Sequence, residues 1–212
     1  MSATTNYLDN KLVDWFLRGQ TLTPPATVYV GLIRATKGYS NTVRSTPVSV
    51  GDTVIPATPN GHIYRCTTSG TTGSSEPTWP TSNNGTVTDG TAVWTEQYAD
   101  LKAASANVTE VSGGAYARVS VSSALAQWAG TQGQGTTTAS SGSSGTTSNN
   151  NSVTFPAPSG ANWGVIFGFM IFDASTAGNG LIFAPLTTPK TVNNNDPAPS
   201  FAAGALTWQI DN

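Results

Sequence analysis

The chain has 212 residues, of which only 9% are charged, and its formal net charge at pH 7 is -2. Ordinary globular proteins carry about 25% charged residues, so serine, threonine, glycine and asparagine supply the polar surface here. Because the chain lacks the basic surface on which nucleic-acid binding depends, we expect no nucleic-acid partner.

The first predicted element is a helix over residues 6–18. Its apolar residues recur at spacings of three and four, namely Tyr7, Leu8, Leu12, Trp15 and Phe16. Thr5 or Asn6 suits the start of the helix, and Gly19 suits its end. Such a stripe normally packs against the core of its own domain. The alternative is docking against a neighbouring subunit, for which Tyr7 and Trp15 are the candidates.

Residues 26–35 form a predicted strand, because they are rich in β-branched side chains. Their composition resembles that of the apolar run that begins at Trp163. We therefore expect these two strands to share one sheet.

Turn residues crowd the segment 44–98, which predicts a small inserted module of short antiparallel strands. So small a unit needs bulky anchors, and Tyr64, Trp79 and Trp94 are available. Aromatic faces also bind sugar rings, so the same three residues are candidates for glycan contact. Trp79 lies between Pro77 and Pro80 and is expected to be the most exposed of them, and Trp94 the least.

Residues 116–121 alternate between apolar and polar side chains, as a half-buried strand does. Residues 130–152 are rich in threonine, serine, glycine, glutamine and asparagine, with Ala139 as the single apolar residue. This segment cannot bury enough apolar surface to order itself, so we expect an exposed loop. Strand-like sequence resumes at residues 153–155.

Residues 163–186 hold two apolar runs on either side of a turn, which predicts a hairpin. The first run is apolar on both alternating faces. One predicted face carries Val165, Phe167, Phe169 and Ile171. A strand apolar on both faces is buried on both faces, so a second layer must cover it. That layer is another sheet, the N-terminal helix or a partner subunit, and Phe167 and Phe169 are candidates for subunit contact.

Many short strands and one helix predict a mainly β fold, an antiparallel β-sandwich that is jelly-roll-like. Its body comprises residues 1–43 and 99–212. The module of residues 44–98 is expected to project outward from that body.

The sequence contains few residues of the types that catalyse reactions or bind metals. His62 is the single histidine and Cys66 the single cysteine, which excludes an intramolecular disulfide and a cluster of thiolates. A catalytic triad or a metal site lacks partners for His62. We expect no catalytic residue, metal or cofactor, and no enzyme. No apolar run reaches roughly 18 residues and no secretory leader is visible, so we expect neither a membrane span nor a signal peptide.

Several segments in consistent order resemble tail fibre and tail structural proteins of tailed bacteriophages. They are residues 6–15, 25–32, 111–118, 153–156, 163–164, 187–192 and 200–204. The resemblance implies a non-enzymatic virion component, made in the cytoplasm of the bacterial host.

The module of residues 44–98 is similar to a small unit found in phage tail, baseplate and fibre proteins. The similar segments are residues 51–54, 61–73, 76–80 and 88–94. They are also distantly similar to chitin-binding modules of bacterial glycosidases. This resemblance implies a host cell-surface glycan as a partner.

Three functions follow from these patterns and resemblances. The first is a tail fibre, tail-tip or baseplate subunit that assembles with other virion proteins as a homo-oligomer, with a trimer as the preferred state. The second is a glycan-binding adhesion module. The third is a capsid decoration or head-fibre protein.

Overall fold

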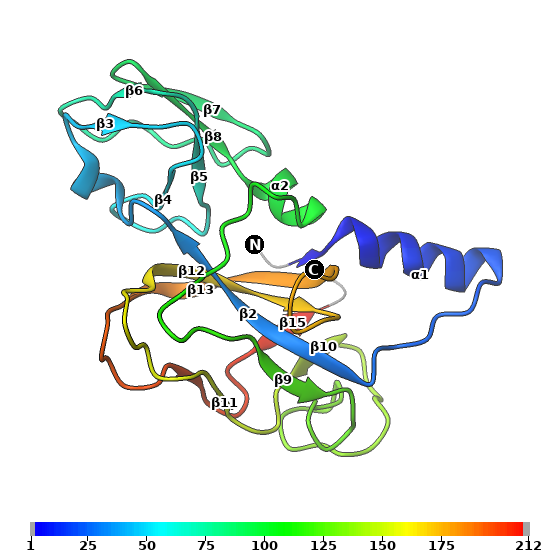
Figure 1. Ribbon diagram of the computed structural model, residues 1–212. Coiled ribbons are helices and arrows are strands. Elements are labelled where there is room, and N and C mark those ends of the chain that lie inside the picture. The colour runs from blue at the N-terminus through cyan, green and yellow to red at the C-terminus, as the bar shows by residue number, and fades with distance from the viewer. Residues whose placement is uncertain (1–2, 210–212) are drawn as a thin grey trace.

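The computed structural model describes residues 3–209, and its central layer is a five-stranded antiparallel sheet (Figure 1). In spatial order its strands are β1 (Ala3–Thr4), β13 (Gly180–Val192), β12 (Gly164–Phe172), β2 (Thr27–Ala35) and β9 (Val119–Ser122). The predicted hairpin is the antiparallel pair β12–β13. Strand β2 pairs with the other edge of β12, so the expectation that the two share a sheet is confirmed.

Smaller antiparallel sheets surround this layer. A four-stranded sheet comprises β4 (Thr53–Val54), β5 (Tyr64–Thr68), β8 (Ala92–Glu96) and β7 (Thr86–Asp89). Three two-stranded ribbons pair β3 (Pro47–Val48) with β6 (Gly70–Thr71), β10 (Thr146–Ser148) with β15 (Thr207–Gln209), and β11 (Val153–Thr154) with β14 (Ser200–Phe201). The helices are α1 (Asn6–Arg18), the short α2 (Tyr98–Ala103) and a 3-10 turn at Ser40–Val43. The predicted mainly β, antiparallel fold with one main helix is confirmed.

Both faces of the central sheet are covered by the chain itself, in a sandwich-like arrangement. On one face, β2 and β12 pack against residues of the C-terminal half, including Phe155, Trp163 and Leu206. On the other face, the same strands pack against Ile55 and Ile63 from segment 44–98 and against α2. The second layer predicted for the apolar strand is therefore this segment together with α2. Helix α1 does not supply it.

The predicted alternation along β12 is wrong, because the strand contains a bulge. The pairing register shifts between Ile166 and Gly168 against both β2 and β13. An extra residue in one strand reverses the faces that follow it. Phe167 therefore packs with Ile55 and Ile63, whereas Phe169 packs in the opposite cluster. With exposures of 3% and 5%, both lie in the chain's own core and are not available for subunit contact.

The segment 130–152 is more ordered than its composition predicts. Residues 131–145 contain no helix or strand, but Thr146–Ser148 forms β10, paired with β15. Asn149 is fully buried and accepts from the Leu206 N–H at 2.8 Å. Its amide donates to the carbonyls of Asn151 and Ala202, each at 2.8 Å. The predicted exposed loop thus ends in a buried, ordered part, because the Asn149 side chain forms hydrogen bonds with three backbone groups.

Candidate functional site

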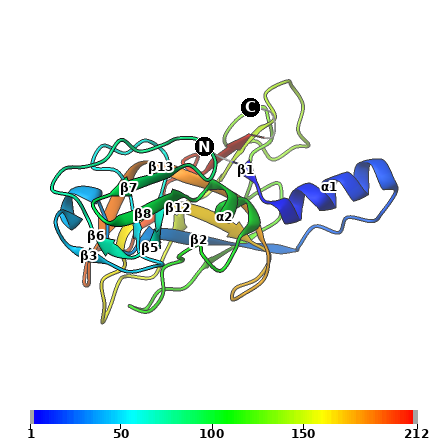
Figure 2. The ribbon, with the colours of Figure 1, turned by 90° about the horizontal axis from the view of Figure 1, so that it is seen from above.

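Helix α1 leaves the edge of the central sheet and extends away from the rest of the molecule, as both views show (Figures 1 and 2). The side chain of Thr5 accepts a hydrogen bond from the Leu8 N–H, which caps the start. Gly19, with φ 66°, ends the helix in the left-handed conformation. The helix therefore has the predicted bounds.

The predicted packing of α1 against the core is wrong. Of its residues none is buried, and only Leu8 packs against the core cluster. The reason is the direction of the helix, which carries the later turns beyond the edge of the sheet. The exposed fractions are 38% for Tyr7, 49% for Val13, 52% for Trp15, 77% for Phe16 and 72% for Leu17.

The exposed apolar surface of α1 is comparable in area to the largest apolar patch on a typical single chain. Large apolar side chains offer about 150–250 Å² each, so Val13, Trp15, Phe16 and Leu17 in the second half of the helix together expose roughly 450 Å². The largest apolar patch on a typical monomer is about 300–600 Å² and is often functional. The C-terminal half of α1 is therefore a candidate contact surface for another protein.

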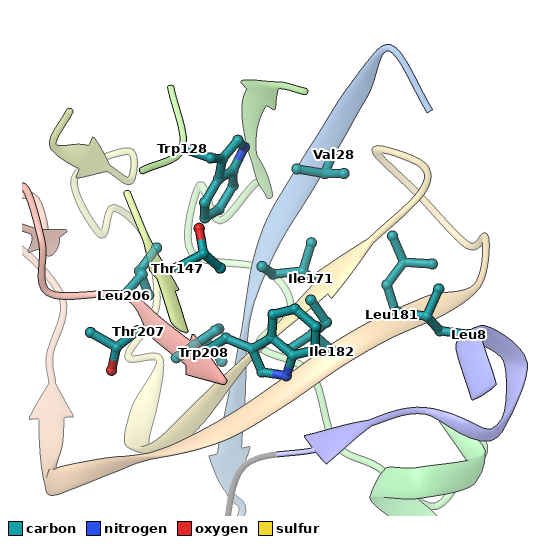
Figure 3. Close-up of a pocket in the computed structure, with 11 residues that line it drawn as sticks. Leu8, Val28, Trp128, Thr147, Ile171, Leu181, Ile182, Leu206, Thr207 and Trp208 are labelled. Atoms are coloured by element: carbon teal, nitrogen blue, oxygen red, sulfur yellow. The ribbon is translucent and has the colours of Figure 1, made fainter. Parts of the chain in front are cut away.

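An apolar groove of about 280 Å³ opens beside the start of α1 (Figure 3). The central sheet contributes Val28, Phe169, Ile171, Leu181 and Ile182, and the ribbon of β10 and β15 with its neighbours contributes Trp128, Thr147, Leu206, Thr207 and Trp208. Leu8 lines the end nearest α1. None of these residues is charged, so the groove suits an apolar occupant.

The three aromatic residues of segment 44–98 form a cluster, and two of its members are inaccessible. Tyr64 and Trp94 are both 0% exposed, and Trp79 is half-buried. The ring centroids are 4.4 Å apart for Tyr64 and Trp79, and 6.2 Å apart for Trp79 and Trp94. The prediction of glycan contact is wrong for Tyr64 and Trp94, because they form the core of the segment. Only Trp79 offers exposed ring surface.

Hydrogen bonds hold Trp79 and its neighbour Glu76 in place. The Trp79 indole N–H donates to the Glu76 carboxylate at 2.7 Å, and the Ala57 N–H donates to the same oxygen at 2.9 Å. Burial alone would raise the pKa of Glu76, but these bonds and one from the Ser40 hydroxyl outweigh it and lower that pKa below its ordinary value. Glu76 is therefore an anchored, ionised carboxylate at neutral pH and has a structural role.

A family model described as Podophage GP4 fiber I protein gp80 matches residues 3–99 and 81–209. The chain belongs to this family of phage fibre proteins. The two matched segments together span the described structure, including residues 44–98. Among curated proteins, none matches the chain.

Residues of the segment 111–118 stabilise the fold of this fibre protein through hydrogen bonds to Glu110 and to strand β2. Tyr116 donates to the Glu110 carboxylate at 2.8 Å and accepts from the Leu32 N–H at 2.8 Å. Arg118 pairs with Glu110 through two bonds of 2.8 and 2.7 Å. Burial and the nearby Glu110 charge raise the pKa of Tyr116, so its hydroxyl stays protonated. Glu110 was not singled out from the sequence, because only the fold brings it to these partners.

The described part of the fibre protein shows no arrangement for metal chemistry. Within residues 3–209, no three His, Cys, Asp or Glu side chains gather in a way that could hold a metal ion. His62 pairs with the buried Glu96 at 2.9 Å. Among the helices of the same range, none is long and apolar enough to cross a membrane. Of the predicted subunit-contact residues, Tyr7 and Trp15 on α1 are the accessible ones.

Proposed function

We propose that this fibre-family chain is a structural subunit of a phage virion that acts by assembling into a homo-oligomer. The observation that carries the proposal is the uncovered apolar surface of α1. Apart from Leu8, the apolar residues of this helix lie outside the core, so they stabilise the helix only when another surface covers them. The low charge of the chain fits a subunit that packs into a rigid assembly. A closed trimer is our proposed state.

Replacing Trp15 and Phe16 together by serine is expected to convert the oligomer into monomers. Large aromatic anchors at protein interfaces contribute about 2 kcal/mol or more each, so the subunit affinity should fall by roughly a thousandfold. Light scattering and sedimentation equilibrium over a range of concentrations measure the change. Because neither side chain is buried in the single chain, its circular dichroism should be unchanged.

Leu125→Ser is the matched control, since Leu125 is an exposed leucine outside α1 with 54% exposure. This variant should remain oligomeric. An unmodified chain that stays monomeric at high concentration would overturn the proposal. An oligomer that persists after the double substitution would show that α1 is not the assembly surface.

We also propose that the subunit is located in a tail fibre or at the tail tip or baseplate. Membership of a family described by a fibre protein supports this location over a capsid decoration. No reaction is part of the proposal. A reconstruction of the particle tests it, and density for the chain on the capsid alone would contradict it.

A second candidate function is contact with a host glycan through Trp79. The half-buried ring is held rigidly by Glu76 and Tyr64, which suits stacking on a sugar. We expect Trp79→Ala to reduce binding on a glycan array at least tenfold, whereas Val50→Ala, at an exposed apolar residue of the same segment, leaves it unchanged. Absence of binding by the unmodified chain, or binding that survives Trp79→Ala in a folded protein, would reject this candidate.

A further inference from the structure

We propose that the C-terminal half of α1 from one copy of this chain docks in the apolar groove of the next copy. The groove is the one lined by residues of β2, β12, β13 and the β10–β15 ribbon, with Leu8 at its end. This inference rests on the proposed assembly function and adds where the helix binds. Its occupant is a second copy of the same chain.

The two surfaces match in chemistry. Leu12, Val13 and Phe16 lie on one side of α1, with Trp15 and Leu17 at its two flanks, and the five residues form a shallow apolar notch. At 100° per residue, Lys11, Asp14 and Arg18 gather on the opposite side. Arg18 and Asp14 already pair with each other at 2.8 Å. Docking of the apolar side into the uncharged groove would therefore bury no unpaired charge.

Helix α1 is held in a direction that keeps its later turns out of its own groove. The preceding strand β1 pairs with β13, and the Thr5 N–H donates to the Leu181 carbonyl at 2.9 Å. The Thr5 hydroxyl donates to the Gly180 carbonyl at 2.5 Å. Lys102 of α2 forms an ion pair with Asp9. These contacts fix the first turn, so Leu8 alone reaches the groove of its own chain.

A contact of modest area gains stability when it is repeated in a closed ring. The exposed apolar residues in the second half of α1 offer roughly 450 Å², of which the groove, lined largely by buried and half-buried side chains, covers a part. In a closed ring every chain gives one helix and receives another, so each chain takes part in two contacts. Each chain is therefore held on two sides, and removing one chain from a closed ring breaks two contacts at once.

A disulfide between two differently tagged chains tests the docking. One chain carries Leu17→Cys on α1, and the other carries Thr207→Cys at the exposed rim of the groove. After mixing and mild oxidation, we expect a covalent dimer at least tenfold more abundant than with a control partner that carries Val50→Cys. The native Cys66 is fully buried, and burial raises the pKa of its thiol, so it stays out of the reaction.

The outcomes separate this inference from the proposed function. Oligomers in solution with no cross-link above the control would overturn the docking site and leave assembly standing. A chain that is monomeric throughout would overturn both. The chain that carries both cysteines serves as a further arm: a bond formed within single chains at high dilution would assign the groove to the chain's own helix and reject the exchange between copies.

Discussion

Replacing Arg44 by alanine is expected to destabilise the protein by about 3 kcal/mol, because the substitution leaves a buried carboxylate without its cation. Arg44 binds Asp89 through two parallel hydrogen bonds of 2.8 and 2.7 Å. The Asp89 side chain is 1% exposed, so this carboxylate is shielded from water and depends on the Arg44 cation. Asp89 would retain bonds only from the Gly73 N–H at 2.8 Å and the Trp94 indole at 3.2 Å.

Chemical denaturation followed by circular dichroism measures the loss. The matched control is Lys37→Ala, which removes the cation of another ion pair, where Lys37 is 40% exposed and the Nζ to Asp52 oxygen distance is 3.4 Å. Exposed ion pairs contribute at most about 1 kcal/mol, so the control should lose far less stability than the variant. Equal small losses for the two variants would show that the buried pair does not stabilise the fold.

Segment 44–98, which holds both partners of this ion pair, contributes to the core of the body. Ile55 and Ile63 of the segment cover one face of β12, so loosening the segment would uncover Phe167 and Met170. An uncovered sheet face of this kind favours aggregation. The Arg44 variant should therefore form aggregates at lower temperatures than the control as well as unfold earlier.

Local sequence patterns correctly predicted those elements of the fold that depend on interactions between residues close in the sequence. The bounds of α1 follow from Thr5 and Gly19, which cap its two ends. The hairpin β12–β13 follows from two apolar runs around a polar turn. The pairing of β2 with β12 follows from their shared composition, since strands buried on both faces belong in the interior of a sheet.

The same local patterns could not predict contacts between residues far apart in the sequence. An apolar stripe on α1 specifies a helix face that needs a cover, but it does not say which surface covers it. The burial of Asn149 gives no apolar signal, because its side chain is satisfied by three backbone groups that are close only in the folded chain. The sequence allowed two roles for Tyr64 and Trp94, namely core packing and glycan contact. A unit this small needs bulky side chains for its core, and that need buries both residues.

Replacing Gly168 by alanine is expected to destabilise the protein by about 3 kcal/mol and to disrupt the central sheet. A Cβ atom on Gly168 would lie 2.4 Å from the Ala184 carbonyl oxygen and 3.0 Å from the Pro185 Cα. Both are backbone atoms of the paired strand β13, so no side chain can rotate away. The bulge beside Gly168 depends on this close approach, as glycine within a strand often indicates.

Thermal unfolding of Gly168→Ala should be compared with that of Gly160→Ala. A Cβ atom on Gly160 would meet no other part of the chain within 4 Å, and the φ of +84° alone makes alanine unfavourable there by about 1 kcal/mol. Similar unfolding temperatures for the two variants would contradict the clash. The bulge also directs Phe169 and Ile171 toward the groove, while Phe167 points to the other face. A variant that keeps its secondary structure but relaxes the bulge should therefore lose oligomer formation together with the groove.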